Sequence, residues 1–229
     1  MPLPSLLLAF VLLPVAGADP EPGVSEPFDG KLRLKWTVVR PDEKRWSLKK
    51  NKGKLTITTQ RGSIHGTTAK DLLARNLFLL KNPFGRNADF QVSVRVDVFA
   101  PAAHYHQGGL LLYDDDDNYV KFTCEYNGGK KGKRILVMMR ETGGKPEHKT
   151  ADAPTEDKPF WLRLAKRKNA YEYASSPDGK KWTAHQTWEW GGKGPAMIGL
   201  MAKNGGTDAP EIDVTFADFQ ARPLVGKGK

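Results

Sequence analysis

Cysteine is nearly absent from this chain, which has a single one, Cys124, among 229 residues. One cysteine excludes an intrachain disulfide, so the fold must be held together by its hydrophobic core even in an oxidising compartment. Cys124 falls on the apolar side of an alternating segment and has no evident basic neighbour that would stabilise a thiolate. The sequence therefore predicts a buried, unreactive thiol rather than a nucleophile.

Long hydrophobic runs are also missing, apart from one at the N-terminus. Residues 1–18 carry no charge, contain an apolar stretch at Leu6–Leu13, and end in the small residues Ala16-Gly17-Ala18. This run is too short to cross a bilayer and resembles a secretory signal peptide, although it lacks the usual lysine or arginine at its start. An apolar first strand of the fold is the alternative. We expect cleavage before Asp19 and a secreted or periplasmic protein.

Helical periodicity is scarce, and so are the short motifs of common enzymes. Only Leu72–Leu80 has an apolar pattern that a helix could share, and Asn82-Pro83 follows it, so we interpret it as a loop leading into a strand at Leu77–Leu80. The chain has no Gly-x-Ser-x-Gly elbow, no phosphate loop and no dinucleotide-binding fingerprint. These absences remove the motif evidence for serine hydrolases and nucleotide-dependent enzymes.

The chain does contain many short alternating segments. Apolar residues occupy every second position of Phe90–Val98, and Tyr119–Tyr126 alternates in the same way, so we expect Asp89–Tyr126 to form adjacent strands. A period of two places successive side chains on opposite faces of a sheet. Further strand candidates lie at 36–39, 46–48, 55–59, 107–113, 133–140, 160–168, 171–173, 181–190, 196–202 and 212–219. About a dozen short strands separated by turn residues predict an all-β sandwich.

The net charge is strongly positive, at +10, and the sequence pI is about 9.6. The basic residues are spread over several turns and the C-terminal tail, at 49–54, 130–134, 166–168 and 227–229. Such a field favours anionic partners, such as an acidic polysaccharide or a cell-envelope polymer. We expect no nucleic acid partner, because no recognisable nucleic-acid motif is present. A solvated basic surface without a specific partner is the alternative.

The stretch Tyr105–Tyr126 carries a more specific pattern. It reads Y-H-Q-G-G-L-L-L-Y-D-D-D-D-N-Y-V-K-F-T-C-E-Y. This resembles the block Y-x-Q-A-G-L followed by D-x-x-N-W-x-K-x-x-x-E-Y of a concanavalin A-like family of little-characterised proteins, which is related to the C-terminal domain of bacterial β-xylosidases. The departures are Gly108, where alanine is usual, and Tyr119, where tryptophan is usual. Supporting pieces are Phe28-Asp29, Trp46-Ser47-Leu48, Phe160–Leu164 and the hairpin Tyr173–Trp182.

The resemblance implies an all-β, two-sheet antiparallel jelly-roll sandwich of the concanavalin A-like lectin and glucanase type. It implies a concave face but no established reaction, because fold alone does not fix function. On this basis we expect a signal peptide at 1–18, a linker at 19–27, one jelly-roll domain at 28–222 and a basic tail at 223–229.

Three groups of side chains invite a chemical interpretation. Glu211–Phe216 resembles the Glu-x-Asp-x-x-Glu strand of jelly-roll glucanases, but Phe216 replaces the last carboxylate, so we predict no catalytic residue there. The acidic stretch Asp114–Asn118, together with Glu125, nearly has calcium-loop spacing, but the position that requires glycine is Tyr119. We therefore expect an ordinary acidic turn, with a loosely bound Ca²⁺ as the alternative. His104 and His106 supply fewer ligands than zinc needs, so we predict no metal and no cofactor.

The remaining signal is a set of aromatic and planar polar residues at outward positions of the expected strands. Aromatic rings cover the apolar face of sugars, while amides, carboxylates and guanidinium groups hydrogen-bond their hydroxyls. We therefore expect one concave groove lined by Arg95, Gln107, Tyr113, Tyr119, Lys121, Glu125, Trp161 and Arg163. An ion-paired sheet surface is the alternative.

The sequence thus favours a non-catalytic, lectin-like carbohydrate-binding protein, with acidic glycans as a candidate ligand class. The second hypothesis is a glycoside hydrolase or polysaccharide lyase that uses Glu125 with Lys121 or a tyrosine of the same groove. The third is a structural, envelope-associated protein whose basic turns contact an anionic polymer.

Overall fold

The computed structural model describes residues 23–65, 72–97, 99–126, 134–154, 158–190, 193–205 and 209–224. The expected signal peptide, the first residues of the expected linker and most of the basic tail lie outside these residues. So do Val98 and the lysines at 130–133.

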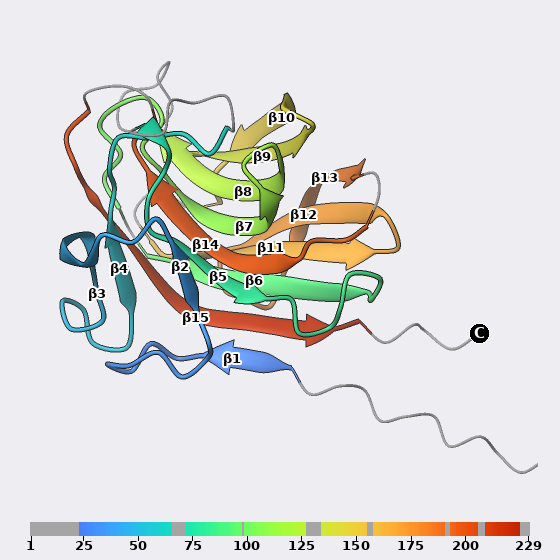
Figure 1. Cartoon of the computed structure of the whole chain (residues 1–229), viewed down its shortest axis with the longest axis horizontal. Coiled ribbons are helices and arrows are strands. Elements are labelled where there is room, and N and C mark those ends of the chain that lie inside the picture. Colours follow the sequence, from blue (N-terminus) through green and yellow to red (C-terminus); the bar gives the residue numbers. More distant parts are fainter. Residues whose placement is uncertain are drawn as a thin grey trace, which may run out of the picture.

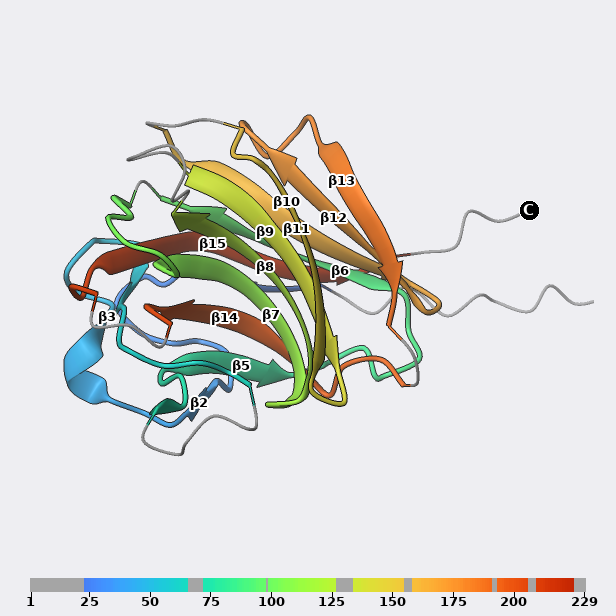
Figure 2. The ribbon, with the colours of Figure 1, turned by 90° about the horizontal axis from the view of Figure 1, so that it is seen from above.

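The described chain forms two antiparallel sheets that face each other (Figures 1 and 2). One sheet has eight strands; along its path these are β13 (Thr183–Glu189), β12 (Ala170–Ser176), β11 (Phe160–Arg167), β6 (Phe90–Val96), β15 (Asp213–Pro223), β4 (Leu55–Thr58) and β3 (Trp46–Ser47), with β1 (Val24–Glu26) paired to β15. The other has seven: β10 (Lys145–Asp152), β9 (Arg134–Thr142), β8 (Asn118–Tyr126), β7 (Gln107–Asp115), β14 (Met197–Lys203), β5 (Leu77–Lys81) and β2 (Thr37–Val39). The jelly-roll prediction is confirmed.

Alternation along each strand fills the space between the sheets. On β8, Val120, Phe122 and Cys124 point inward and are completely buried. Partners from the opposite sheet, such as Val94 and Leu164, join the same cluster. Cys124 is a free thiol, and its burial raises its pKa to about 12, so it stays protonated and unreactive at neutral pH.

The outer face of the seven-stranded sheet is partly covered by the chain between β4 and β5. In this segment the amide of Gly62 donates to the carbonyl of Gly205, and Ala74 donates to Ser63. Ile64 packs down onto the sheet and forms a second apolar cluster with residues of β5, β7, β8 and β14, namely Leu77, Leu79, Leu111, Tyr113, Tyr119 and Met201. His65 also belongs to this crossing segment.

Several elements differ from the sequence-based expectation. The stretch Asp89–Tyr126 does not form one set of adjacent strands, because β7 and β8 pair with each other while β6 lies in the opposite sheet. The expected linker contains β1, which pairs with β15. The strand β10 was not expected, since its polar residues show no apolar alternation. Leu72–Leu80 does lead into a strand, β5. Among the described residues, no helix is long and apolar enough to cross a membrane.

The first described segment is anchored by a buried carboxylate. Oε2 of Glu26 accepts hydrogen bonds from the amides of Arg33 and Leu34 at 2.8 and 3.0 Å, and from Nε1 of Trp36 at 3.0 Å. Oε1 accepts from the amide of Phe28 at 3.3 Å. A single side chain thus organises the chain that follows β1.

We expect Glu26→Gln to lower the free energy of unfolding by about 2 kcal/mol, because the amide group turns a donor toward backbone donors and loses charge-assisted bonds. Urea denaturation measures this change. The exposed Glu43→Gln serves as the control and should leave the midpoint unchanged. Equal midpoints for the two variants would contradict the anchoring role of Glu26.

Candidate functional site

A cavity of about 610 Å³ lies on the outer face of the seven-stranded sheet. Its floor is formed by outward side chains of β7, β8, β9 and β14, and its rim by the crossing segment, the loop before β7 and the exposed strand β10. The lining residues include Ile64, His65, His104, Tyr105, Gln107, Tyr119, Lys121, Glu125, Tyr126, Ile135, Val137, Met139, Glu141, Gly144, Pro146, His148 and Lys203.

One end of this cavity is charged. Lys203, Gln107 and Glu125 are cross-strand partners in a row over β14, β7 and β8. Lys121 lies on the same face of β8, and its Nζ donates to Oε1 of Gln107 at 2.6 Å and contacts Oε1 of Glu125 at 3.4 Å. Thr123 donates its hydroxyl to the same Glu125 oxygen at 3.2 Å. Lys203, paired with Gln107 across the strands, adds a second buried amino group beside Lys121 and Glu125.

Lys203 has the most altered environment of this group. Burial, and secondarily the nearby charge of Lys121, lower the pKa of Lys203 to about 7, although Glu125 acts in the opposite direction. Loss of hydration disfavours the charged form of a buried lysine. An anion bound beside Lys203 would offset this loss of hydration and favour its charged form.

The wall next to Lys203 is aromatic. Tyr105 is 54% exposed although it is large and apolar, and its backbone has a φ of 66°. Its ring lies 6.0 Å from Nζ of Lys203 and packs so closely on Gly205 that a Cβ there would meet the tyrosine side chain at 2.5 Å. Nearby, His104 makes an edge contact with Tyr126. The cavity thus presents an exposed ring beside charged and amide groups.

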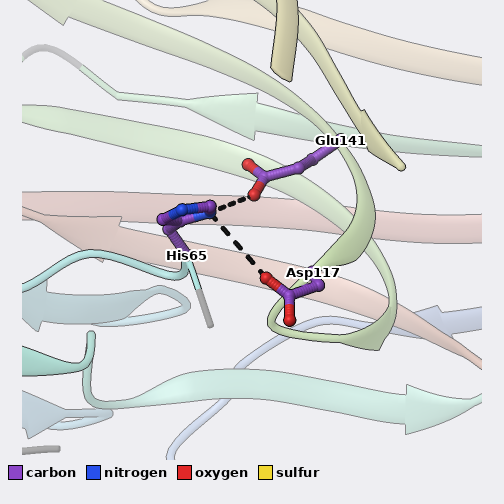
Figure 3. Close-up of side chains that lie close together, drawn as sticks. All are labelled: His65, Asp117 and Glu141. Carbon is purple, nitrogen blue, oxygen red and sulfur yellow. Dashed lines mark hydrogen bonds and ion pairs between the residues drawn. The ribbon is translucent and has the colours of Figure 1, made fainter. Parts of the chain in front are cut away.

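The other end contains a second polar cluster, drawn in Figure 3. Glu141 pairs with Tyr119 across β8 and β9, and the Tyr119 hydroxyl donates to Oε2 of Glu141 at 2.5 Å. Oε1 of Glu141 contacts Nδ1 of His65, which comes from the crossing segment. Oδ1 of Asp117, in the β7–β8 turn, lies 3.8 Å from the same nitrogen. Burial and the bond to Glu141 raise the pKa of Tyr119 well above its usual value.

Comparison with known proteins identifies the family of this chain. Residues 40–224 match the family described as "Protein of unknown function (DUF1349)". The chain belongs to the DUF1349 family. No curated protein matches it significantly.

Solved structures share the fold of this DUF1349 chain. The GH43 protein BlXynB of Bacillus licheniformis is 23% identical, with a TM-score of 0.74, over 87% of this chain and 39% of that one. A xylan β-1,4-xylosidase of Bacillus halodurans is 16% identical, with a TM-score of 0.71, over 92% and 41%. A β-glucanase of Bacillus licheniformis is 10% identical, with a TM-score of 0.58, over 89% and 98%. The chain thus spans about two fifths of the GH43 proteins, and the resemblance to the xylosidase-related family is confirmed.

The structure brings together only part of the groove expected from the sequence. Gln107, Tyr119, Lys121 and Glu125 line the cavity. Tyr113 is on the same face but lies under the crossing segment, where its hydroxyl donates to Asp116 at 2.9 Å and burial raises its pKa to about 12.

Arg95, Trp161 and Arg163 do not belong to this groove. They lie on β6 and β11 of the eight-stranded sheet, so the expectation of one groove lined by all eight residues is corrected. There Arg95 stacks over Trp161, with 5.8 Å from its guanidinium carbon to the ring centroid. Arg163 stacks over Trp182 at 4.5 Å. A period of two identifies the outward face of each strand, but it cannot show which sheet a strand joins.

The acidic turn Asp114–Asp117 is engaged in separate contacts. Asp114 pairs with Arg86, while Asp116 receives both guanidinium NH groups of Arg40 at 2.9 and 3.0 Å. Oδ1 of Asp115 accepts a hydrogen bond from the Asp117 amide at 2.9 Å. Among the described residues, the one group of three potential metal ligands is His65, Asp117 and Glu141, which takes only Asp117 from this turn.

The two histidines before β7 have separate roles. Nδ1 of His106 accepts from the amides of Ala102 and Ala103, and Nε2 contacts the carbonyl of Pro210 at 2.8 Å. Both ring nitrogens of His106 are thereby used, and its burial lowers its pKa. His104 instead lies on the cavity wall.

The carboxylates of the cavity do not form an obvious glycosidase pair. Glu141 is opposite Tyr119, six residues along β8 from Glu125, which is about 20 Å of extended strand. Paired carboxyl groups in glycosidases are about 5–9.5 Å apart. Glu211 and Asp213 pair with Arg45 and Lys50 beside the eight-stranded sheet, away from this cavity.

Sequence reasoning missed three of the residues that matter here. Lys203 is the last residue of a short apolar strand, His65 precedes β5 by a dozen positions, and Glu141 is the penultimate residue of β9. Each was unremarkable alone. Glu141 and Lys203 continue the outward alternation of β9 and β14, and this alternation was the only sequence signal for either residue. Placing them near β8 also requires the strand order, which the alternation does not give.

Proposed function

We propose that this protein binds acidic oligosaccharides, in particular uronic acid-containing glycans, in the outer-face cavity, without a reaction on the sugar. The observation that carries the proposal is the exposed ring of Tyr105 beside the buried group Lys203, Lys121, Glu125 and Gln107. This combination suits a ligand with an apolar ring face and charged or hydroxylated edges.

The size and polarity of the cavity support a sugar ligand. About 610 Å³ is within the usual range of small-molecule sites and has room for a short oligosaccharide. Ile135, Met139 and Pro146 give the cavity an apolar side. The amide of Gln107 can donate to and accept from sugar hydroxyl groups, and the carboxylate of Glu125 can accept from them.

The balance of charge supports an acidic sugar rather than a neutral one. Lys121 is held between Gln107 and Glu125, whereas Nζ of Lys203 lies 6.0 Å from the centre of the Tyr105 ring and has its charge disfavoured by burial and by Lys121. A ligand carboxylate placed between the two ammonium groups would relieve their repulsion and stabilise the charged form of Lys203.

The structural neighbours add indirect support. They include a xylan β-1,4-xylosidase and a β-glucanase, so the same fold occurs in proteins that act on polysaccharides. We also propose that the chain is exported, since residues 1–18 have the composition of a signal peptide. An N-terminus at Asp19 in protein recovered from its native host would support export, and an intact Met1 would contradict it.

Calorimetric titration with tetragalacturonate tests the binding proposal. We expect Tyr105→Ala to weaken binding about tenfold or more, because the exposed ring is the apolar platform. Trp161→Ala is the matched aromatic control; it lies on the other sheet and should bind as wild type. The fully methyl-esterified tetramer keeps the sugar rings but loses the charge, and it should bind more weakly. Equal binding of both tetramers, or a loss only in Trp161→Ala, would contradict the proposal.

A further inference from the structure

The cluster at the other end of the cavity has the composition of a metal site. It combines one imidazole nitrogen of His65 with carboxylate oxygens of Asp117 and Glu141, all within 4.8 Å of one another. The three residues come from the crossing segment, the β7–β8 turn and the end of β9. Since the fold brings them together from distant parts of the chain, no local turn or strand pattern accounts for the cluster.

The burial of Glu141 is the strongest individual observation. Its side chain is only 1% exposed, while those of His65 and Asp117 are 33% and 43% exposed. A carboxylate is rarely buried to this degree unless it is paired or coordinates a cation. Tyr119 holds Oε2 through a hydrogen bond of 2.5 Å, which directs Oε1 toward His65. Outer hydrogen bonds of this kind orient carboxylate ligands in metal sites.

The turn that carries Asp117 is held in place by its neighbours. The amide of Gly144 donates to the Asp117 carbonyl, and the amide of Gly143 donates to Oδ1 of Asn118, both at 3.0 Å. Gly144 has a φ of 73°, and a Cβ there would lie 3.3 Å from Oδ1 of Asp117 and 3.5 Å from Cε1 of His65. The β9–β10 turn thus approaches closely because it has no side chain at this position.

We propose that His65, Asp117 and Glu141 bind a divalent transition metal ion, with Zn²⁺ as the fitting representative. Ligand atoms around a tetrahedral zinc ion lie about 3.3 Å apart, given metal–ligand distances of about 2.0–2.1 Å. The nitrogen of His65 lies nearer than this to Glu141 and at 3.8 Å from Asp117, so small side-chain rotations bring the three atoms to the required spacing. One nitrogen and two carboxylates suit zinc better than Ca²⁺, which takes six to eight oxygen ligands.

The cavity lies on the open side of this site. His65, Glu141 and Gly144 line it, so a fourth coordination position faces the space assigned to the glycan. A three-ligand site with an exposed fourth position is the arrangement in which zinc holds water or a ligand oxygen. The proposed metal site does not depend on the proposed glycan binding, because its ligands are separate from Lys121, Glu125 and Lys203.

Metal binding by untagged protein is measured by equilibrium dialysis with Zn²⁺ and, separately, with Ca²⁺. We expect one Zn²⁺ per chain at micromolar concentration or below, and much weaker retention of Ca²⁺. His65→Ala and Asp117→Asn should each raise the dissociation constant at least about a hundredfold, and Tyr119→Phe about tenfold, as for other outer-shell changes. His148→Ala removes an exposed histidine of the same cavity and should change the dissociation constant for Zn²⁺ less than twofold.

Circular dichroism of each variant shows whether it is folded, and only folded variants enter the comparison. Asp117→Asn changes a half-buried turn residue and tests the site even if His65→Ala destabilises the crossing segment. The proposal is overturned if wild-type protein retains no zinc at micromolar concentration. It is equally overturned if folded Asp117→Asn binds zinc as tightly as wild type, or if His148→Ala is the variant that loses the ion.

Discussion

Gly109→Ala is expected to lower the free energy of unfolding by at least about 3 kcal/mol, the upper end of typical overpacking costs. A Cβ at this position of β7 would lie 2.1 Å from the carbonyl oxygen of Phe122 and 2.8 Å from Cα of Thr123. Both atoms belong to the backbone of β8, which cannot move without breaking the β7–β8 register. The floor of the cavity depends on that register, because it aligns Gln107 with Glu125.

Gly108→Ala provides the matched comparison. Its Cβ would meet Cγ1 of Val214 at 2.5 Å and Cζ of Phe216 at 3.2 Å, which are side-chain atoms and can shift. Alanine is also the usual residue at this position in the resembling family. We expect a cost of about 1 kcal/mol, measured by urea denaturation. If Gly109→Ala is no more destabilising than Gly108→Ala, the result would contradict the close backbone approach of β7 and β8 at Gly109.

Lys203→Met is expected to have opposite effects on binding and on stability. At pH 6 it should weaken tetragalacturonate binding about tenfold or more, since it removes a buried ammonium group from the anion site. It should also stabilise the protein, because a flexible apolar side chain replaces a buried charge. Lys145→Met on exposed β10 is the control and should change neither quantity. Loss of stability in Lys203→Met would contradict the assigned environment.

The effect of Lys203→Met on stability should depend on pH. The pKa of Lys203 is about 7 in the folded protein, below the value of about 10.4 of an unfolded lysine. Between these values the unfolded chain binds more protons, so this residue makes wild-type stability rise with pH from about 7 to about 10. The advantage of Lys203→Met should therefore be largest below pH 7, on the order of 4 kcal/mol, and shrink above it. Wild-type affinity for the acidic tetramer should fall as pH rises through 7.

Local patterns predicted the elements of this fold well. The alternation in Tyr119–Tyr126 correctly placed Val120, Phe122 and Cys124 in the core. Turn residues separated most strands, and the block Tyr105–Tyr126 led to the right family. These features succeed because side-chain alternation and turn conformation are set by neighbouring residues.

Such local patterns could not predict how the strands are arranged in the two sheets. The groove expectation joined Arg95 and Trp161 to Lys121 because all three alternate outward, yet β6 and β11 belong to the other sheet. Lys121 and Glu125 were expected at outward positions of a concave groove; they line the cavity there but are largely buried, which the alternation alone does not reveal. The polar strand β10 and the approach of His65 to Glu141 depend on pairing and loop paths across the whole chain.

The central claim is that an acidic glycan occupies the outer-face cavity, and methionine methyl NMR tests it most directly. Met138 and Met139 are neighbours on β9, but Met138 is buried in the core between the sheets while Met139 lines the cavity. Titration of methyl-labelled protein with tetragalacturonate should shift the Met139 signal and leave Met138 nearly unchanged. An unshifted Met139 at saturating ligand, or shifts confined to methyl groups away from the cavity, would contradict the account.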